Sequence, residues 1–291
     1  MAHLSRPRPQ RTIGRPVAVS GRGYWSGTPV RVMFEPAAAD TGVVFVRSDL
    51  GAVAVIPARI GHRVEATQRT VLAAGPAEVQ MVEHVLSALA ALCIDNCRVI
   101  VDAAELPGLD GSAAAFVAAL DEAGSVDSGA TVAPLVVGEP VRVESEAGWI
   151  EAGPPRHGHD GLSIDYELDY GPGPIGRQRL EILVTSDSYR RELAGARTFL
   201  GIEEARRLQE SGLGCAVSTS DLVIFGPDGP VDNALRWPDE CVRHKVLDAV
   251  GDLALAGRPI VGHIRAHRSG HRLNAALVVA LLAAAARVSA A

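Results

Sequence analysis

The hydrophobic pattern divides the chain into two parts that repeat one order of elements. Between residues 12 and 60, short apolar runs alternate with turns that contain Gly and Pro, which is typical of β-strands. Residues 78–92 then have apolar positions three and four apart, which predicts a long helix. A strand at 96–104 and a second helix at 109–124 complete this first part.

The second part repeats this order of sheet, long helix, strand and helix. Its predicted elements are strands at about 135–144, 148–152, 162–170 and 178–186, a helix at 239–256, a strand at 257–268 and a last helix from His271. Residues 121–134, rich in Gly, Ser, Asp and Pro, predict a linker. An extra segment at about 197–225 is interpreted as a helix returning to a strand.

These patterns predict an α+β protein of two similar domains, residues 1–126 and residues 127–291. Each domain is expected to be a β-sheet packed on helices, and together they form a two-layer sandwich with the helices between the sheets. The first domain would carry Glu83 and His84. The second would carry the helix at 239–256, the last helix and the insert at about 197–225.

Composition narrows the class of protein. Hydrophobic residues make up 47% and aromatic residues 4% of 291, so an aliphatic core is expected. A net charge of −6 gives no basic surface for nucleic acid, which we exclude as a partner. The longest apolar run, 275–286, would span about 18 Å as a helix against about 30 Å of hydrocarbon, so no integral membrane segment is expected.

The ends and the cysteines indicate a compartment. Residues 1–16 have no apolar segment after their arginines, so we interpret them as a frayed tail and not as a secretory signal. The four cysteines form no CxxC pair, which favours reduced thiols. A cytoplasmic location is therefore predicted.

Three polar residues share one face of the helix at 239–256. His244, Asp248 and Asp252 are spaced by four, so their side chains stack about 6 Å apart, and Gly251 is expected to leave open room beside them. An imidazole and a carboxylate one turn apart can reach a single divalent ion. The alternative is a solvated face of an amphipathic helix, and a metal site needs a third ligand.

The first long helix offers that ligand. If the two parts are equivalent, their long helices pack against each other between the sheets. His84 with His244 and Asp248 would then give two imidazoles and one carboxylate on a catalytic zinc, with a position left for water. Glu83 would lie beside the metal and act as general base. The alternative is an ordinary exposed pair.

His271 lies at the start of the last helix, after Gly270, where the backbone can come close to a substrate. Its imidazole could protonate a leaving amine, with Asp252 orienting it and keeping it protonated. The alternative is a neutral surface histidine, because a helix start lowers the pKa of an imidazole. Lys245 and Arg268 would suit an anionic substrate, unless they are simply solvated charges.

Other sequence motifs are weaker candidates for a functional site. HGHD at 157–160 could bind a metal, yet it lies in a loop rich in Gly and Pro without a matching partner. GPGPIG at 171–176 fits a dinucleotide pattern only literally, because its prolines lack amide donors and no helix follows. The chain has no HExxH, GxSxG or phosphate-loop motif, which excludes the familiar forms of zinc protease, serine hydrolase and nucleotide triphosphatase.

Six sequence blocks occur in a fixed order: VEHVLSALAAL, IDN, ELPGLDGSAAAFV, ARTF, VRHKVLDAVGDL and SGHRLN. Together they resemble the UDP-3-O-acyl-N-acetylglucosamine deacetylase family, the zinc enzymes of the committed step of lipid A synthesis. The resemblance covers nearly the whole chain. It implies hydrolysis of the N-acetyl group of UDP-3-O-acyl-N-acetylglucosamine, with one zinc ion per chain and a monomeric protein.

The resemblance also implies residue roles. The zinc ligands would be His84, His244 and Asp248, the base Glu83, and the acid His271 with Asp252 behind it. Thr198 would help polarise the carbonyl, and Phe199 would line a passage for the fatty acyl chain, formed by the insert. Lys245 and Arg268, together with Gly270, would face the sugar and diphosphate.

One departure from the family pattern affects the substrate. The family usually has Gly-Leu-His-Ser-Gly where this chain has Gly23-Tyr24-Trp25-Ser26-Gly27, so the mouth of the site is expected to differ and the acyl-chain length stays open. Two alternatives remain: a deacetylase of another N-acetylated amino-sugar nucleotide, or a non-catalytic metal-binding homologue. Retention of Glu83 and His271 argues against the second.

Overall fold

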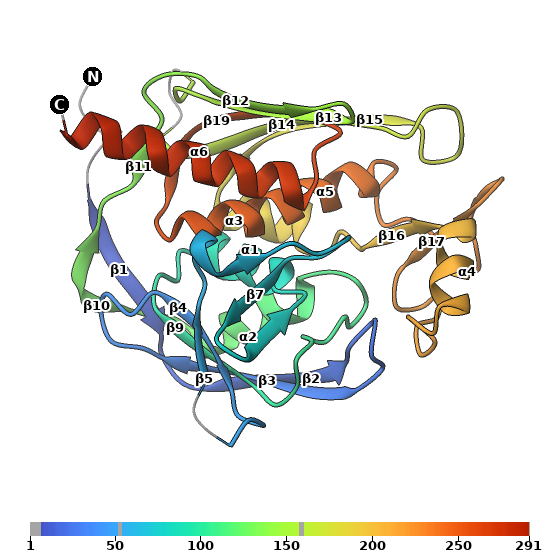
Figure 1. The fold of residues 1–291 in the computed structure, drawn as a ribbon, viewed down its shortest axis with the longest axis horizontal. Helices are drawn as coiled ribbons and strands as arrows, with labels where there is room; N and C mark the ends of the chain where they lie inside the picture. The colour runs from blue at the N-terminus through green and yellow to red at the C-terminus, as the bar shows by residue number, and fades with distance from the viewer. Residues whose placement is uncertain (1–6, 52–53, 157–159, 291) are drawn as a thin grey trace.

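Two mixed β-sheets form the outer layers of the molecule, with helices between them (Figure 1). This computed structural model describes residues 7–51, 54–156 and 160–290. The first sheet has the strand order β2 (Val17–Arg22), β3 (Pro29–Pro36), β9 (Cys97–Val101), β4 (Val43–Arg47) and β5 (Ala54–Pro57). Its inward residues alternate along each strand, as in β3, where Val30, Val32 and Phe34 are buried.

The second sheet has the strand order β12 (Val141–Ser145), β13 (Gly148–Gly153), β19 (Ile260–His267), β14 (Leu162–Asp169) and β15 (Arg177–Val184), and the short β11 (Leu135–Val136) pairs with β19. In both sheets the successive pairings are antiparallel, antiparallel, parallel and antiparallel. The second half therefore repeats the first, and the predicted α+β class with helices between two sheets is confirmed.

Four helices fill the space between the sheets: α1 (Glu83–Ala91), α2 (Ala114–Ala123), α5 (Glu240–Leu253), which continues as the 3₁₀ turn η3 (Ala254–Ala256), and α6 (His271–Ala290). A short α3 (Ser186–Ser188) and the π-helix η2 (Tyr189–Leu193) precede the insert. α5 packs on α1, α6, β14 and β15. Because it is covered on most sides, its residues His244, Asp248 and Asp252 are buried and do not form a solvated face.

The backbones of α1 and α5 approach closely at Gly251. An ideal Cβ built on Gly251 would lie 2.8 Å from the carbonyl carbon of Glu83 and 3.1 Å from its Cα. The expectation that Gly251 leaves open room beside the polar face was wrong, because the backbone of α1 fills that room. The glycine instead lets the two helices bring their polar residues together.

Two smaller β units flank the helices. The first is η1 (Ile60–His62) followed by β6 (Arg63–Val64), β7 (Val71–Ala74) and β8 (Ala77–Gln80). The second is the insert, with β16 (Phe199–Gly201), α4 (Ile202–Glu210), β17 (Val223–Gly226) and β18 (Gly229–Pro230). The prediction of a helix returning to a strand at 197–225 is confirmed, since β16 and β17 pair in parallel around α4.

Three local predictions were wrong. The expected frayed tail contains β1 (Arg8–Ile13), and the expected linker contains β10 (Ser125–Val132), which pairs with β1 in an antiparallel ladder. Residues 78–80 belong to β8 and not to the first long helix, because the left-handed backbone at Met81, whose φ is 61°, separates the strand from α1. The proposed division into residues 1–126 and 127–291 falls inside β10 and remains a prediction.

No helix in the described part of the chain is long and apolar enough to cross a membrane.

Candidate functional site

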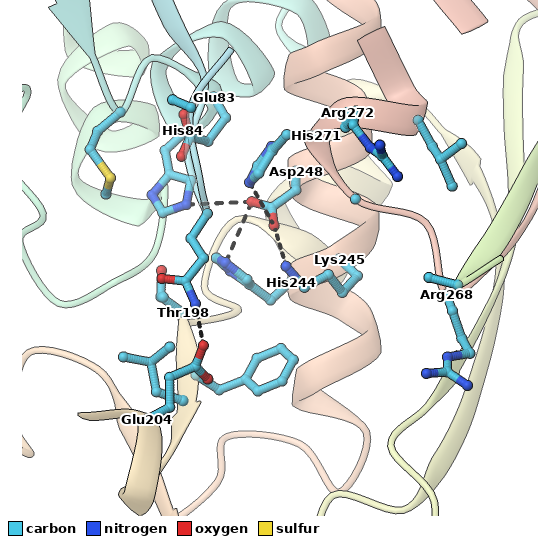
Figure 2. A pocket seen from close by; sticks show the side chains of 18 of the residues that line it. Glu83, His84, Thr198, Glu204, His244, Lys245, Asp248, Arg268, His271 and Arg272 are labelled. Carbon is cyan, nitrogen blue, oxygen red and sulfur yellow. Dashed lines mark hydrogen bonds and ion pairs between the residues drawn. The ribbon is translucent and has the colours of Figure 1, made fainter. Parts of the chain in front are cut away.

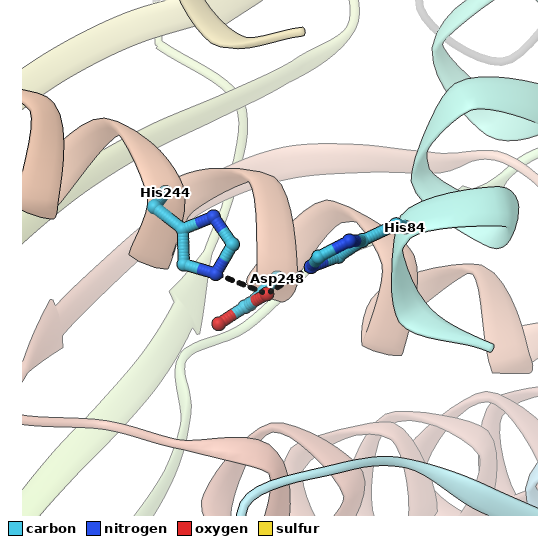
Figure 3. Close-up of side chains that lie close together, drawn as sticks. All are labelled: His84, His244 and Asp248. Carbon is cyan, nitrogen blue, oxygen red and sulfur yellow. Dashed lines mark ion pairs between the residues drawn. The ribbon is translucent and has the colours of Figure 1, made fainter. Parts of the chain in front are cut away.

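Three side chains from α1 and α5 converge between the two sheets (Figure 3). His84 Nε2 lies 3.6 Å from Asp248 Oδ1, and His244 Nε2 lies 3.4 Å from the same oxygen. The three ligand atoms all lie within 4.8 Å of one another, so the cluster could hold a metal ion. Among the residues that the structure describes, this is the single cluster of that kind.

The residues around the cluster orient its ligand atoms and favour the protonation states that bind a cation. The Nδ1 atom of His244 pairs with the carbonyl oxygen of Ala196 at 3.1 Å, so its Nε2 lone pair faces Asp248. Burial lowers the pKa of His244 to about 3, which keeps the imidazole neutral, the form that binds a metal. Burial works against the charge of Asp248, yet His244 and Lys245 hold the pKa of Asp248 well below its ordinary value. Lys245 Nζ lies 2.9 Å from Asp248 Oδ2.

Glu83 begins α1 beside this cluster, with 2% of its surface exposed. Its Oε2 accepts the backbone N–H of Thr70 at 3.0 Å. Burial raises the pKa of Glu83, although the charges of His271 and His84 oppose this shift. A carboxylate with a raised pKa accepts a proton more readily near neutral pH, which suits a general base.

His271 faces the same space from the start of α6. Its Nδ1 lies 2.8 Å from Asp252 Oδ2, and its Nε2 lies 4.0 Å from Asp248 Oδ2. Burial opposes protonation, but the carboxylates of Asp252, Asp248 and Glu83 outweigh it and raise the pKa of His271 to about 9. The alternative of a surface histidine does not fit this environment, because only 11% of the His271 side chain is exposed and its Nδ1 lies against Asp252.

A pocket of about 360 Å³ opens over these groups, and Figure 2 shows side chains that line it from both halves. Its lining includes all five remaining predicted site residues: Thr198, Phe199, Lys245, Arg268 and Gly270. The Phe199 ring lies 6.2 Å from the His244 ring and 5.6 Å from Lys245 Nζ. The roles of these residues remain predictions, although their placement in one pocket is as expected.

Thr198 is already hydrogen-bonded in this state. Its N–H and its hydroxyl donate to the carbonyl oxygen of Gly111 at 2.8 and 3.1 Å. To polarise a substrate carbonyl, the hydroxyl would have to turn away from Gly111. The contact therefore joins the insert to the first half of the molecule as well as lining the pocket.

Several lining residues were not predicted from the sequence. Tyr170, at the end of β14, is 54% exposed, and its ring lies 5.6 Å from that of Phe199. Gln68 donates a hydrogen bond to Glu204 of α4 across the pocket mouth. Arg272 adds a positive charge beside Arg268 on one side (Figure 2). These residues come from separate segments with no shared motif, so no local signal groups them.

The residues that depart from the family pattern lie next to this pocket. The Tyr24 hydroxyl donates to the carbonyl oxygen of Asp221 in the insert. Trp25 Nε1 donates to the sulfur of Met81, a lining residue, at 3.4 Å. Tyr24 therefore contacts the insert, and Trp25 contacts a residue that lines the pocket. The alternative HGHD site falls mainly on residues 157–159, which lie outside the described residues.

Comparisons with known proteins show the family of this chain. The family model LpxC, described as UDP-3-O-acyl N-acetylglycosamine deacetylase, matches residues 10–283. Proteins named UDP-3-O-acyl-N-acetylglucosamine deacetylase from Brucella ovis, Brucella canis and Brucella abortus are 41% identical over 275 residues, which covers 94% of this chain and 95% of theirs. The chain belongs to the UDP-3-O-acyl-N-acetylglucosamine deacetylase family.

Proposed function

We propose that this protein is a zinc-dependent deacetylase that hydrolyses UDP-3-O-acyl-N-acetylglucosamine to UDP-3-O-acyl-glucosamine and acetate. The observation that carries the proposal is the convergence on one pocket, in a chain of this family, of a cluster that could hold a metal, the buried carboxylate of Glu83 and the part-buried pair of His271 and Asp252. Burial raises the pKa of Glu83, and neighbouring carboxylates raise the pKa of His271 to about 9, which suits a base and an acid respectively.

The donor set fits zinc. Two imidazoles and one carboxylate, from His84, His244 and Asp248, form a three-ligand set of the kind found in catalytic zinc sites. When bound there, zinc supplies a positive charge that acidifies water and polarises a carbonyl oxygen. The hydrogen bond of His244 to Ala196 and the ion pair of Asp248 with Lys245 would keep these ligands oriented.

The proton transfers belong to the protein side chains. As water attacks the acetyl carbon, Glu83 accepts a proton from it, and the carbonyl π bond opens to a tetrahedral species. When the C–N bond then breaks, His271 donates its proton to the leaving nitrogen, so the products are acetate and a free amine. Asp252 stabilises the charged imidazole before that transfer.

Substrate recognition divides between the two sides of the pocket. We propose that Phe199 and the insert line the passage for the fatty acyl chain. Lys245 and Arg268, with the backbone at Gly270, would face the sugar and the diphosphate, and Thr198 would approach the acetyl carbonyl. A place in lipid A synthesis, a cytoplasmic location and a monomeric state complete the proposal.

The test is the release of acetate and free amine, followed by mass spectrometry. The purified protein with zinc would be given UDP-3-O-acyl-N-acetylglucosamine or UDP-N-acetylglucosamine, with Glu83→Gln as the matched control. Burial of an acyl chain contributes about 0.8 kcal/mol per methylene, so kcat/KM should fall by at least about 100-fold without it. Equal rates would favour another amino-sugar nucleotide, and no turnover of any such substrate would indicate a non-catalytic homologue.

A further inference from the structure

Thr70 is a fully buried polar residue to which the proposed reaction assigns no role. It lies directly before β7, and β7 and β8 form a hairpin in which Val71 pairs with Gln80. The hairpin register therefore places Thr70 beside Met81, two residues before α1 begins at Glu83. The carbonyl oxygen of Thr70 accepts the N–H of Val82 at 3.4 Å, which holds the two segments together.

Two hydrogen bonds connect Thr70 to both proton-transfer groups. Its backbone N–H donates to Glu83 Oε2 at 3.0 Å. Its hydroxyl donates to Asp252 Oδ1 at 2.6 Å and lies 3.3 Å from His271 Nδ1. A hydroxyl has one proton, and an ionised carboxylate only accepts, so the short contact to Asp252 is the donated bond.

The other oxygen of Asp252 is held from the opposite side. Asp252 Oδ2 accepts from Asn274 Nδ2 at 2.8 Å and lies at the same distance from His271 Nδ1. Asn274 and His271 both belong to α6 in the second half of the molecule, whereas Thr70 comes from the first half. In the described part of the chain, Thr70 alone hydrogen-bonds both Glu83 and Asp252.

We propose that Thr70 is a positioning residue that fixes the base Glu83 relative to the His271–Asp252 pair across the interface between the two halves. This inference rests on the proposed function, since it concerns the same two proton transfers. Both protons must move at one substrate amide, and a misplacement of about 1 Å can lower a rate by about 100-fold. A single residue bonded to both carboxylates limits that misplacement.

The experiment compares two substitutions at Thr70 with a control elsewhere. Thr70→Val keeps the shape and deletes the hydroxyl, so kcat should fall by about 10- to 100-fold while KM stays within about twofold. Thr70→Ser keeps the hydroxyl and should retain most of kcat. Thr12→Val deletes another buried hydroxyl, one that accepts the N–H of Ala37 in the first half, and should leave kcat unchanged.

Further measurements separate positioning from stability. Thr70→Val should retain one zinc per chain and unfold no earlier than Thr12→Val. In an Asp252→Ala background, where the hydroxyl has lost its acceptor, Thr70→Val should lower kcat by less than about twofold more, because coupled groups are not additive.

The outcomes distinguish the two proposals. A wild-type protein without deacetylase activity would overturn the proposed function. An active wild type whose Thr70→Val variant keeps its kcat would overturn the role of Thr70 alone. The same conclusion would follow if Thr70→Ser lost as much activity as Thr70→Val, or if Thr70→Val lost zinc or stability beyond the Thr12→Val control, since packing and not the hydroxyl would then explain the effect.

Discussion

Gly251→Ala should damage the site through the backbone, without touching any side chain of the cluster. The added methyl would lie 2.8 Å from the carbonyl carbon of Glu83 and closer still to its oxygen. Non-bonded carbon atoms prefer about 3.5–4.0 Å, so α1 and α5 must separate locally by about 1 Å. Glu83 and His84 would move with α1, away from His244 and Asp248 on α5.

Whether Gly251→Ala raises or lowers the stability of the protein shows which of two effects dominates, helix propensity or overpacking. Ala in place of Gly in a helix interior should stabilise α5 by about 1 kcal/mol through propensity alone. Overpacking of a close contact costs about 1–3 kcal/mol, and here the neighbour is backbone, which has no rotamer to change. We therefore expect a net loss of up to about 2 kcal/mol, equivalent to a melting temperature lower by up to about 8 °C, and a kcat about 100-fold lower from the displaced base.

Thermal unfolding of the metal-free protein, zinc titration and kcat would be measured together. Gly138→Ala is the matched control, because nothing lies within 4 Å of its added Cβ and its φ is not positive. The control should keep its activity and its zinc affinity, while Gly251→Ala should lose both. A Gly251→Ala protein that is more stable than wild type and fully active would show that the helices are not held together by this contact.

Three further predictions concern the cluster and the proton transfers. His244→Ala should lose the bound zinc, because two ligands remain of three, and metal analysis that still finds one zinc per chain would disprove the assignment. Glu83→Gln should keep the zinc but lower kcat by about two to four orders of magnitude, since an amide cannot accept the proton; near-normal turnover with zinc bound would exclude Glu83 as the base. Because the pKa of His271 is raised to about 9, wild-type activity should fall as the pH rises through about 9. That limb should weaken or vanish in His271→Ala, and it should move to lower pH in Asp252→Asn, where the charge that raises the pKa is gone; a limb unchanged in both variants would refute the role of His271.

The sequence predicted most of the fold because apolar residues recur at regular spacings in the main helices and strands. The apolar positions of α5, such as Val242, Val246 and Val250, are buried as their spacing predicts. The predicted repeat then placed the two long helices side by side, and this step joined His84 to His244 and Asp248. The repeat was the sequence feature that turned a pair of ligands on one helix into a three-residue cluster.

The sequence did not predict β1 and β10, because neither segment has an apolar pattern that indicates a strand by itself. Both are polar and read as a tail and a linker, and each becomes a strand by pairing with the other across more than 100 residues of chain. Side-chain contacts hold the junction: Gln10 accepts from Asn96 at 2.8 Å, and Ser128 donates to the carbonyl oxygen of Gln10 at 3.0 Å. The local sequence pattern cannot indicate pairing with a segment so distant in the chain.

Thr70 and Gly251 were missed or misread for a related reason. The role of Gly251 depends on the backbone of α1 that packs against it. The role of Thr70 depends on a hairpin register that brings it next to Met81. Residue spacing on one helix predicts which side chains share a face. It does not predict whether that face meets solvent, a cavity or the backbone of another helix.

The two halves share a fold but contribute differently to the chemistry. The first half supplies Glu83 and His84 from the start of α1, whereas the second supplies His244, Asp248 and Asp252 from successive turns of α5. A buried carboxylate is stable only when donors or cations surround it, and here one partner of Asp252, Thr70, and one partner of Asp248, His84, come from the opposite half. The contact between the halves therefore both stabilises the buried charges and assembles the site, so a change that loosens this interface should lower stability and activity together.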